Sequence, residues 1–268
     1  MDAGTGPGRE REPESGAGSG LYVGVDWSVD SGAWLALAFG PGGFDHAAVF
    51  DEVGELWLRY EGAERVLLDV PIGLVDEGEA ERAPEALARE VLGERSAAVV
   101  TPPVREATRK RRYPAATRVN ERLTGRGLSE RAFARSEAIA AVDELLRGVP
   151  EARPVVAESH PEVCFRALAG EPMAASPRTA AGYAERLRTL AEFDRDAPRV
   201  VQSAAEATAG YDAPVAVADV LDAAALAYTA RPGPGRLRSL PLEPETDAQG
   251  LPVRMLYRAP EPLPADAE

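Results

Sequence analysis

Three apolar segments that lie far apart in the chain each carry an aspartate at one end. They are residues 21–26, 66–69 and 219–222, and the aspartates are Asp26, Asp69, Asp219 and Asp222. Carboxylates at the rim of buried secondary structure are poorly solvated, and several that converge there repel one another unless a divalent cation neutralises them. The pattern constrains the fold to one that can hold such a cluster, and it predicts a metal site.

The chain has 268 residues, 45% of them hydrophobic, which is enough for one large core or two small ones. No apolar run approaches the length of a membrane span, and the first residues lack the basic start and apolar stretch of a secretory signal. The single cysteine, Cys164, cannot form an internal disulfide and lies among apolar residues, as a packed thiol does. We expect a soluble, cytoplasmic protein with no membrane partner.

The first third of the chain predicts most of a sheet. Strands are expected at 21–26, 33–39 and 44–50, and the short glycine-containing turns between them indicate antiparallel pairing. A helix is expected at 51–60. The short, fully apolar run 65–70 is typical of a parallel strand at the centre of a mixed sheet.

The composition changes after residue 75. From 76 to 148 the chain is rich in Ala, Arg and Glu, which predicts a helical insertion with helices at 84–92, 115–123 and 129–146, the last capped by Ser129. Beyond it we expect a strand at 154–158, helices at 161–168, 180–193 and 214–230, the last with Asp212 as its cap and Pro214 in its first turn, and a strand at 251–257. The apolar pair 200–201 is too short to assign. The terminal segments 1–20 and 258–268 are expected to be disordered.

This order of elements is that of an RNase H-like domain, here over residues 21–257. We therefore expect an α/β fold: an RNase H-like mixed five-stranded sheet flanked by helices, with the helical insertion embedded in it. Five motifs in the same order resemble domain-of-unknown-function family 429, whose members are described as predicted RNase H-like nucleases. The motifs are Gly24-Val-Asp26, Asp69-Val-Pro-Ile-Gly-Leu74, Glu158-Ser-His-Pro-Glu162, Asp219-Val-Leu-Asp-Ala223 and Gly250-Leu-Pro-Val-Arg-Met-Leu-Tyr257.

The four aspartates are the candidate metal ligands. The resemblance implies that Asp26, at the end of the central strand, bridges two metal ions, and that Asp69, after the adjacent parallel strand, completes the pair. Ligands gather at the strand carboxyl ends of such sheets. Asp219 and Asp222 are three residues apart on the predicted helix and share one face. The alternative is structural: strand-end aspartates bind loop amides, Asp219 stabilises a helix N-terminus and Asp222 is solvated.

Glu158 and His160 are expected to assist the aspartates. Glu158 ends an apolar strand and would ligate a metal ion or orient a water molecule. His160 would shuttle a proton or hold Glu158 in place. The alternative is a rigid turn in which His160 bonds the backbone. Glu162 is assigned to the start of the following helix.

The net charge of −14 repels nucleic acid at long range, so a polyanionic partner needs a local basic patch. The insertion supplies one, and its candidate nucleic-acid contacts are Arg105, Arg109, Lys110, Arg111 and Arg112. Interleaved glutamates favour a salt-bridged, solvated face for most of these side chains. Arg105 resembles a family position and is the foremost candidate for a phosphate contact.

Converging carboxylates predict a metal-dependent nuclease that hydrolyses phosphodiester bonds of DNA or RNA with two Mg²⁺ or Mn²⁺ ions. Its catalytic residues would be Asp26, Asp69, Asp222, Glu158 and His160. Two other classes remain open. The segment 24–32 also resembles the first phosphate loop of actin-like and sugar-kinase-like ATP-binding phosphotransferases, although a second such loop is missing from the sequence. A non-catalytic RNase H-like module could instead bind a partner through the arginine-rich insertion.

Overall fold

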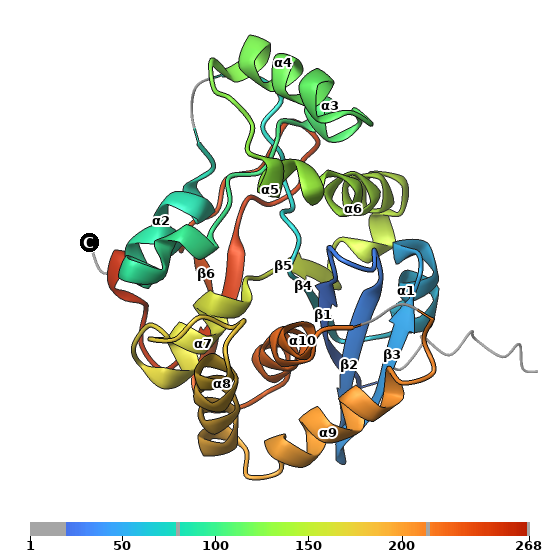
Figure 1. The fold of residues 1–268 in the computed structure, drawn as a ribbon, viewed down its shortest axis with the longest axis vertical. Helices are drawn as coiled ribbons and strands as arrows, with labels where there is room; N and C mark the ends of the chain where they lie inside the picture. The colour runs from blue at the N-terminus through green and yellow to red at the C-terminus, as the bar shows by residue number, and fades with distance from the viewer. Residues whose placement is uncertain (1–19, 79–80, 213–214, 267–268) are drawn as a thin grey trace, which may run out of the picture.

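A mixed five-stranded sheet forms the centre of the fold. The computed structural model describes residues 20–78, 81–212 and 215–266. The first three strands form an antiparallel meander; β4 pairs with β1 and β5 with β4, both in parallel (Figure 1). The order is β3-β2-β1-β4-β5, with bounds β1 (Tyr22–Trp27), β2 (Trp34–Gly40), β3 (Gly43–Phe50), β4 (Arg65–Leu68) and β5 (Val156–Glu158). The predicted α/β fold class is confirmed, and the strand order and directions are consistent with an RNase H-like topology.

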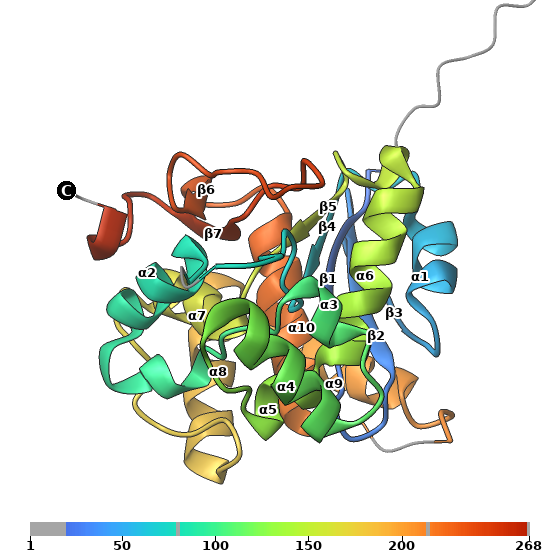
Figure 2. The same cartoon turned by 90° about the horizontal axis from the view of Figure 1, so that it is seen from above.

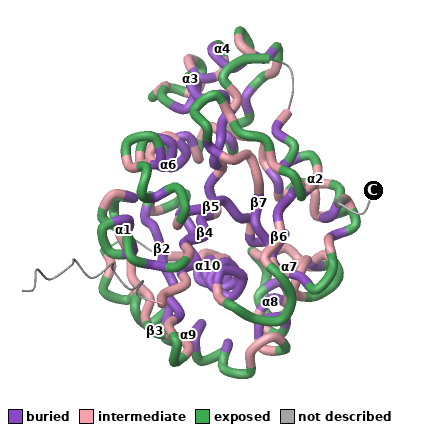
Figure 3. The backbone as a smooth tube through the Cα atoms, turned by 180° about the vertical axis from the view of Figure 1, so that it is seen from behind, coloured by how far each residue is buried: buried purple, intermediate pink, exposed green. Residues whose placement is uncertain are grey.

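Helices cover both faces of the sheet, as Figure 2 shows. One face packs against α1 (Val53–Tyr60) and α6 (Ser136–Gly148). The other packs against α10 (Val217–Ala230), which is buried along most of its length (Figure 3) and is surrounded by α7 (Pro161–Ala169), α8 (Ala180–Phe193) and α9 (Ala197–Ala207). Because side chains alternate along a strand, Val23 and Val25 of β1 enter the first core, whereas Gly24 and Asp26 face α10.

Cys164 lies in α7 and is buried, with its Sγ atom 3.1 Å from Ser159 Oγ. Burial raises the pKa of the Cys164 thiol to about 11. The side chain is therefore a packed thiol, as predicted, and its protonated form makes it a poor nucleophile. None of the described helices is both long and apolar enough to span a bilayer.

The segment between β4 and β5 is helical, as predicted, and its elements are α2 (Ala83–Leu92), η1 (Gly93–Ala98), α3 (Arg105–Thr108), α4 (Tyr113–Thr124), α5 (Glu130–Ala134), α6 and η2 (Pro150–Ala152). The helix expected at 129–146 is two helices, because the chain bends at Arg135 between α5 and α6. Ser129 caps the first of them, since its Oγ accepts a hydrogen bond from Ala132 N at 3.1 Å. α6 covers the sheet, so the last part of the expected insertion belongs to the central layers.

The C-terminal part departs from expectation in several elements. The strand expected at 251–257 is β7 (Met255–Ala259), and it pairs with an unpredicted strand, β6 (Arg236–Leu240). The unassigned pair 200–201 lies inside α9. α10 begins at Val217, and Pro214 lies outside the described residues. Leu263 is buried and is followed by η3 (Pro264–Asp266), so this part of the expected disordered tail packs on the domain.

Candidate active site

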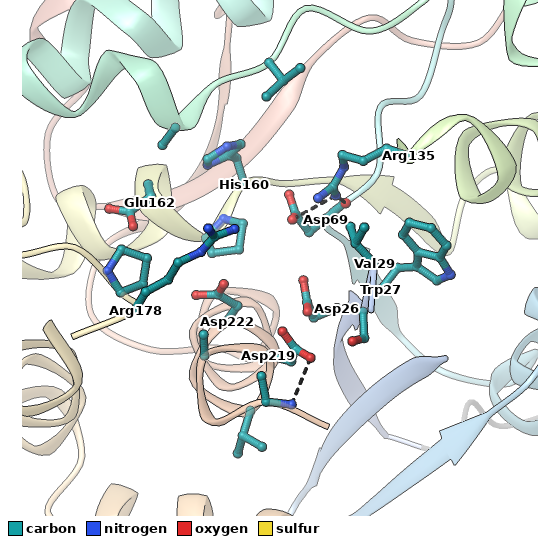
Figure 4. A pocket seen from close by; sticks show the side chains of 18 of the residues that line it. Asp26, Trp27, Val29, Asp69, Arg135, His160, Glu162, Arg178, Asp219 and Asp222 are labelled. Atoms are coloured by element: carbon teal, nitrogen blue, oxygen red, sulfur yellow. Dashed lines mark hydrogen bonds and ion pairs between the residues drawn. The ribbon is translucent and has the colours of Figure 1, made fainter. Parts of the chain in front are cut away.

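A cavity of about 1540 Å³ opens at the carboxyl ends of β1, β4 and β5. Its lining includes all four predicted aspartates, which we call the aspartate cluster: Asp26, Asp69, Asp219 and Asp222. Figure 4 shows their carboxylates around one space, below His160. The cavity lies where open α/β sheets bind ligands, because the strand ends leave a crevice there. The structure thus brings together the residues that the sequence placed on three distant segments.

Asp26 lies near the end of β1 on the face covered by α10, and it is 5% exposed. Burial raises its pKa well above the ordinary value, and Asp222, Asp69 and Asp219 add to the shift in that order. The nearby Arg135 opposes the shift but does not cancel it. An ionised Asp26 is therefore costly unless further positive charge enters the cavity.

Asp222 lies on α10, is half-buried and faces the same space (Figure 4). Its pKa is raised by burial first, and then by the charges of Asp69 and Glu162. Asp219 has a second task, since its Oδ2 accepts a hydrogen bond from the N-cap nitrogen of Ala216 at 3.1 Å. Asp219 therefore caps the N-terminus of α10, as the structural alternative predicts, and it also lines the cavity.

Asp69 follows β4 and is held by Arg135 rather than by loop amides. Arg135 Nη2 lies 2.9 Å from Asp69 Oδ2 and also donates to the backbone oxygen of Asp69. The charges of Asp69, Asp26 and Asp222 keep the pKa of Arg135 above its ordinary value even though burial lowers it. Arg135 is therefore the guanidinium that the aspartate cluster shares, and sequence analysis did not single it out.

Glu158 lines the cavity but is held in a buried ion-pair group. Its Oε2 accepts hydrogen bonds from Ile72 N at 2.7 Å and from Arg82 Nη2 at 2.5 Å, while Oε1 has no protein partner. Arg82 is also 3.4 Å from Glu85, so two buried carboxylates share one guanidinium. Glu158 is thus anchored by Arg82 and Ile72, and the suggestion that His160 holds it in place is not what the structure shows.

His160 lies at the N-cap of α7 and lines the cavity. Burial lowers the pKa of its imidazole, and the charges of Asp69 and Glu162 and a hydrogen bond with the backbone of Ala98 only partly oppose this shift. The ring is therefore neutral at neutral pH. Its Nδ1 atom is buried without a hydrogen-bond partner, which leaves a lone proton-accepting or proton-donating position in the cavity wall.

Glu162 was assigned only to a helix start, yet it is one of the residues that line the cavity (Figure 4). The fully buried Arg186 donates to its Oε1, and Arg95 lies 3.5 Å from the same atom. Its Oε2 has no partner. One signal could have revealed it: Glu162 follows a strand that ends at the same sheet edge as Asp26 and Asp69.

The predicted basic patch lies elsewhere. Arg105 is 5% exposed and pairs with three aspartates, Asp76, Asp143 and Asp247, so its donors are not available to a phosphate. The other four are Arg109, paired with Asp143 and Glu144, Lys110, paired with Glu106, and the exposed Arg111 and Arg112. Among the described residues the cavity is instead lined by Arg95, Arg131, Arg135 and Arg178.

The aspartate cluster is not a closed metal cage. In the described ranges, no three His, Cys, Asp or Glu side chains are arranged to hold one metal ion together. The donor set nevertheless suits Mg²⁺ or Mn²⁺, because carboxylate oxygens are the ligands that hard divalent cations prefer. Burial, together with the charges of neighbouring carboxylates, raises the pKa of Asp26 and of Asp222, so a bound cation would favour their ionised forms. An ion bound by several of these aspartates therefore requires their side chains to move from the positions seen here.

A family model described as "Protein of unknown function (DUF429)" matches residues 24–246. The matched range starts in β1 at Gly24 and contains the whole aspartate cluster. Comparison with curated proteins and with solved structures finds no match.

Proposed function

This chain belongs to the DUF429 family, and we propose that its aspartate cluster serves a metal-dependent nuclease, an enzyme that hydrolyses phosphodiester bonds of DNA or RNA. One observation carries the proposal: four aspartates from three distant elements line one cavity at the strand carboxyl ends. Like charges held this close destabilise a protein, and the raised pKa values of Asp26 and Asp222 reflect both this repulsion and their burial. Proteins keep strained charge groups of this kind mainly at functional sites.

Asp26 and Asp222 would be the principal ligands, with Asp69 and Asp219 beside them. When bound, a pair of Mg²⁺ or Mn²⁺ ions supplies an activated water and stabilises the leaving oxygen of an in-line displacement. The chain needs no nucleophile of its own for this chemistry. Its neutral His160 offers Nδ1 to accept or return a proton at the cavity wall.

The cavity wall also suits a nucleic-acid chain. Three of the exposed large hydrophobic side chains among the described residues line it: Val29, Tyr183 and Val217. Arg178, which is exposed, lies on the wall opposite Asp69 (Figure 4). Apolar and aromatic surface accepts bases, and a guanidinium accepts phosphate oxygens. The proposed partner is therefore nucleic acid, and with a single buried thiol the proposed location is the cytoplasm.

Cleavage assays test the proposal with labelled single-stranded, duplex and branched substrates in Mg²⁺, Mn²⁺ or a chelator. We expect metal-dependent cleavage by the wild-type protein. Asp26→Asn should lower the rate by roughly 100-fold or more, as expected when a group that supports transition-state charge is removed. The exposed Asp196→Asn, at the start of α9, is the matched control and should cleave normally. Cleavage that survives both the chelator and Asp26→Asn would reject the proposal.

Thermal unfolding of the same variants, in chelator, separates function from structure. Asp26→Asn removes a buried carboxylate that its neighbours repel, so its melting temperature should rise above that of the wild type. An aspartate that served only to bind loop amides would give the opposite result, a lower melting temperature.

A further inference from the structure

The aspartate cluster contains a built-in cation. Arg135 pairs with Asp69 Oδ2 at 2.9 Å and contacts the backbone oxygen of the same residue. It stands at the bend between α5 and α6, so a helix end rather than a helix face presents it to the cavity. Figure 4 shows its guanidinium beside Asp69 on the side of the space that faces Asp26.

One guanidinium does not balance four carboxylates. Asp26 and Asp222 line the same cavity as Asp69, but neither forms an ion pair with a described residue. Without further cations the repulsion between these carboxylates is therefore only partly compensated. A divalent ion would relieve this repulsion, and at Asp69 it would meet a carboxylate whose Oδ2 is already bound by Arg135.

The surroundings of the Arg135–Asp69 ion pair favour replacement of Arg135 by another cation. The side chain of Arg135 is 22% exposed and that of Asp69 is 15% exposed, so both reach the cavity and its solvent. Partial access to water lowers the cost of separating an ion pair, because hydration compensates for part of the lost attraction. The fully buried pair of Arg186 with Glu162 in the same wall is the contrasting case.

We propose that Arg135 is an exchangeable counter-ion that occupies Asp69 in the metal-free protein and competes with divalent cations for it. This inference rests on the proposed function. It assigns Arg135 a positioning role: the side chain keeps the empty cluster folded and sets the metal concentration at which Asp69 becomes a ligand. Metal occupancy and the Arg135–Asp69 pair are then negatively coupled.

The chain offers a matched control for this competition. Arg131 lies on α5, lines the same cavity and carries the same charge. Its guanidinium donates to backbone oxygens of Ala97 and Ala98, at 2.8 and 3.2 Å, and not to a carboxylate. Arg131→Gln thus removes one positive charge from the wall of the same cavity without freeing an aspartate.

Calorimetric titration of Mn²⁺ into the wild type, Arg135→Gln and Arg131→Gln tests the proposal. Arg135→Gln should bind Mn²⁺ about five-fold or more tightly than the wild type, the lower end of usual coupling between sites. Arg131→Gln should change the affinity by less. Equal affinities in the wild type and Arg135→Gln, or equal gains in both variants, would overturn the inference. Binding to none of the three proteins would overturn the proposed function together with it.

Thermal unfolding gives a second readout that does not depend on catalysis. In chelator, Arg135→Gln should melt below Arg131→Gln, because its cluster has lost its cation. Saturating Mn²⁺ should then raise its melting temperature by more than it raises that of Arg131→Gln. Arg135→Lys keeps the positive charge but lacks the planar guanidinium with its several donors. It should fall between the wild type and Arg135→Gln in both measurements. A smaller Mn²⁺ shift in Arg135→Gln than in Arg131→Gln would contradict the exchange.

Discussion

At the scale of single residues, the cavity is defined by which charges have partners. Asp26 makes no ion pair with a described residue, Asp69 pairs with Arg135, and Glu158 shares Arg82 with Glu85. A buried carboxylate without a full counter-charge takes up a proton more readily than one that is fully paired. The site is therefore sensitive to pH before any substrate enters it.

Glu158 gives this sensitivity a measurable form. Burial raises its pKa to about 8 although Arg82 opposes the shift, and Glu85 adds to it. Because the folded pKa lies above the ordinary value of 4.5, the protonated group stabilises the fold. That contribution is complete at pH values below the pKa of Glu158 in the unfolded chain, and it is lost as the pH rises to about 8, the pKa of Glu158 in the folded protein. The loss is about 1.4 kcal/mol for each pH unit over which only the folded state binds the proton.

Guanidinium unfolding of wild type and Glu158→Gln at pH 5, 6.5 and 8 checks this prediction. The stability of the wild type relative to Glu158→Gln should fall as the pH rises through that range. Glu137→Gln, an exposed position on α6, serves as control and should keep a constant offset from the wild type. A difference between wild type and Glu158→Gln that is constant with pH, or that grows with pH, would show that Glu158 is ionised throughout.

At the scale of elements, the contact between β1 and α10 creates the cluster. A Cβ atom at Gly24 would overlap backbone atoms of Ala223, Leu226 and Ala227, so only glycine lets the helix backbone lie directly on the strand. Alanines on α10 complete this close approach. Asp26 lies two residues after Gly24 and Asp222 one residue before Ala223. Close packing of the two elements therefore brings both carboxylates to the same point.

Gly24→Ala should separate the two elements. We expect it to lower the free energy of unfolding by about 1–3 kcal/mol, the usual cost of overpacking a core, and to weaken metal-dependent cleavage by displacing Asp222 from Asp26. Gly54→Ala on α1 is the control. Nothing lies within 4 Å of a Cβ there, so helix propensity should stabilise it by about 0.5–1 kcal/mol. Denaturant titration and the cleavage assay measure both effects, and normal stability in Gly24→Ala would refute the close contact.

At the scale of the whole molecule, Arg105 joins segments that are distant in sequence. Its guanidinium contacts Asp76 after β4, Asp143 on α6 and Asp247 before β7. Asp247 in turn accepts hydrogen bonds from the backbone nitrogens of Leu74 and Leu251. The insertion and the C-terminal hairpin are thus tied to the sheet through one buried side chain, and this explains a basic residue that sequence analysis assigned to nucleic acid.

Arg105→Met should therefore act on stability. Removing the cation leaves the buried Asp247 without an ion-pair partner and takes one of the guanidinium partners from Asp143, at a cost of about 3–5 kcal/mol. The exposed Arg112→Gln should change stability by about 0.5 kcal/mol or less. Chemical denaturation compares the two variants. If Arg105→Met were as stable as Arg112→Gln but bound oligonucleotides more weakly, the earlier assignment of Arg105 as a phosphate contact would be restored.

The sequence by itself determined the elements of the sheet and the places of its aspartates. Alternation and apolar runs fix strands such as β1 and β4, and an aspartate at the end of a parallel strand lies at the carboxyl edge wherever the strand is placed. These signals are local, so they survive without knowledge of the fold. The helix spacing of Asp219 and Asp222 is local in the same sense.

Only the tertiary structure decided which charges meet. Arg105 and Arg135 carry the same group thirty residues apart, yet one is buried among structural aspartates and the other lies in the cavity against Asp69. β6, α9 and the bend at Arg135 likewise depend on packing against distant segments. The physical reason is that an ion pair is set by distance and burial in space, and neither is encoded in the residues next to the charge.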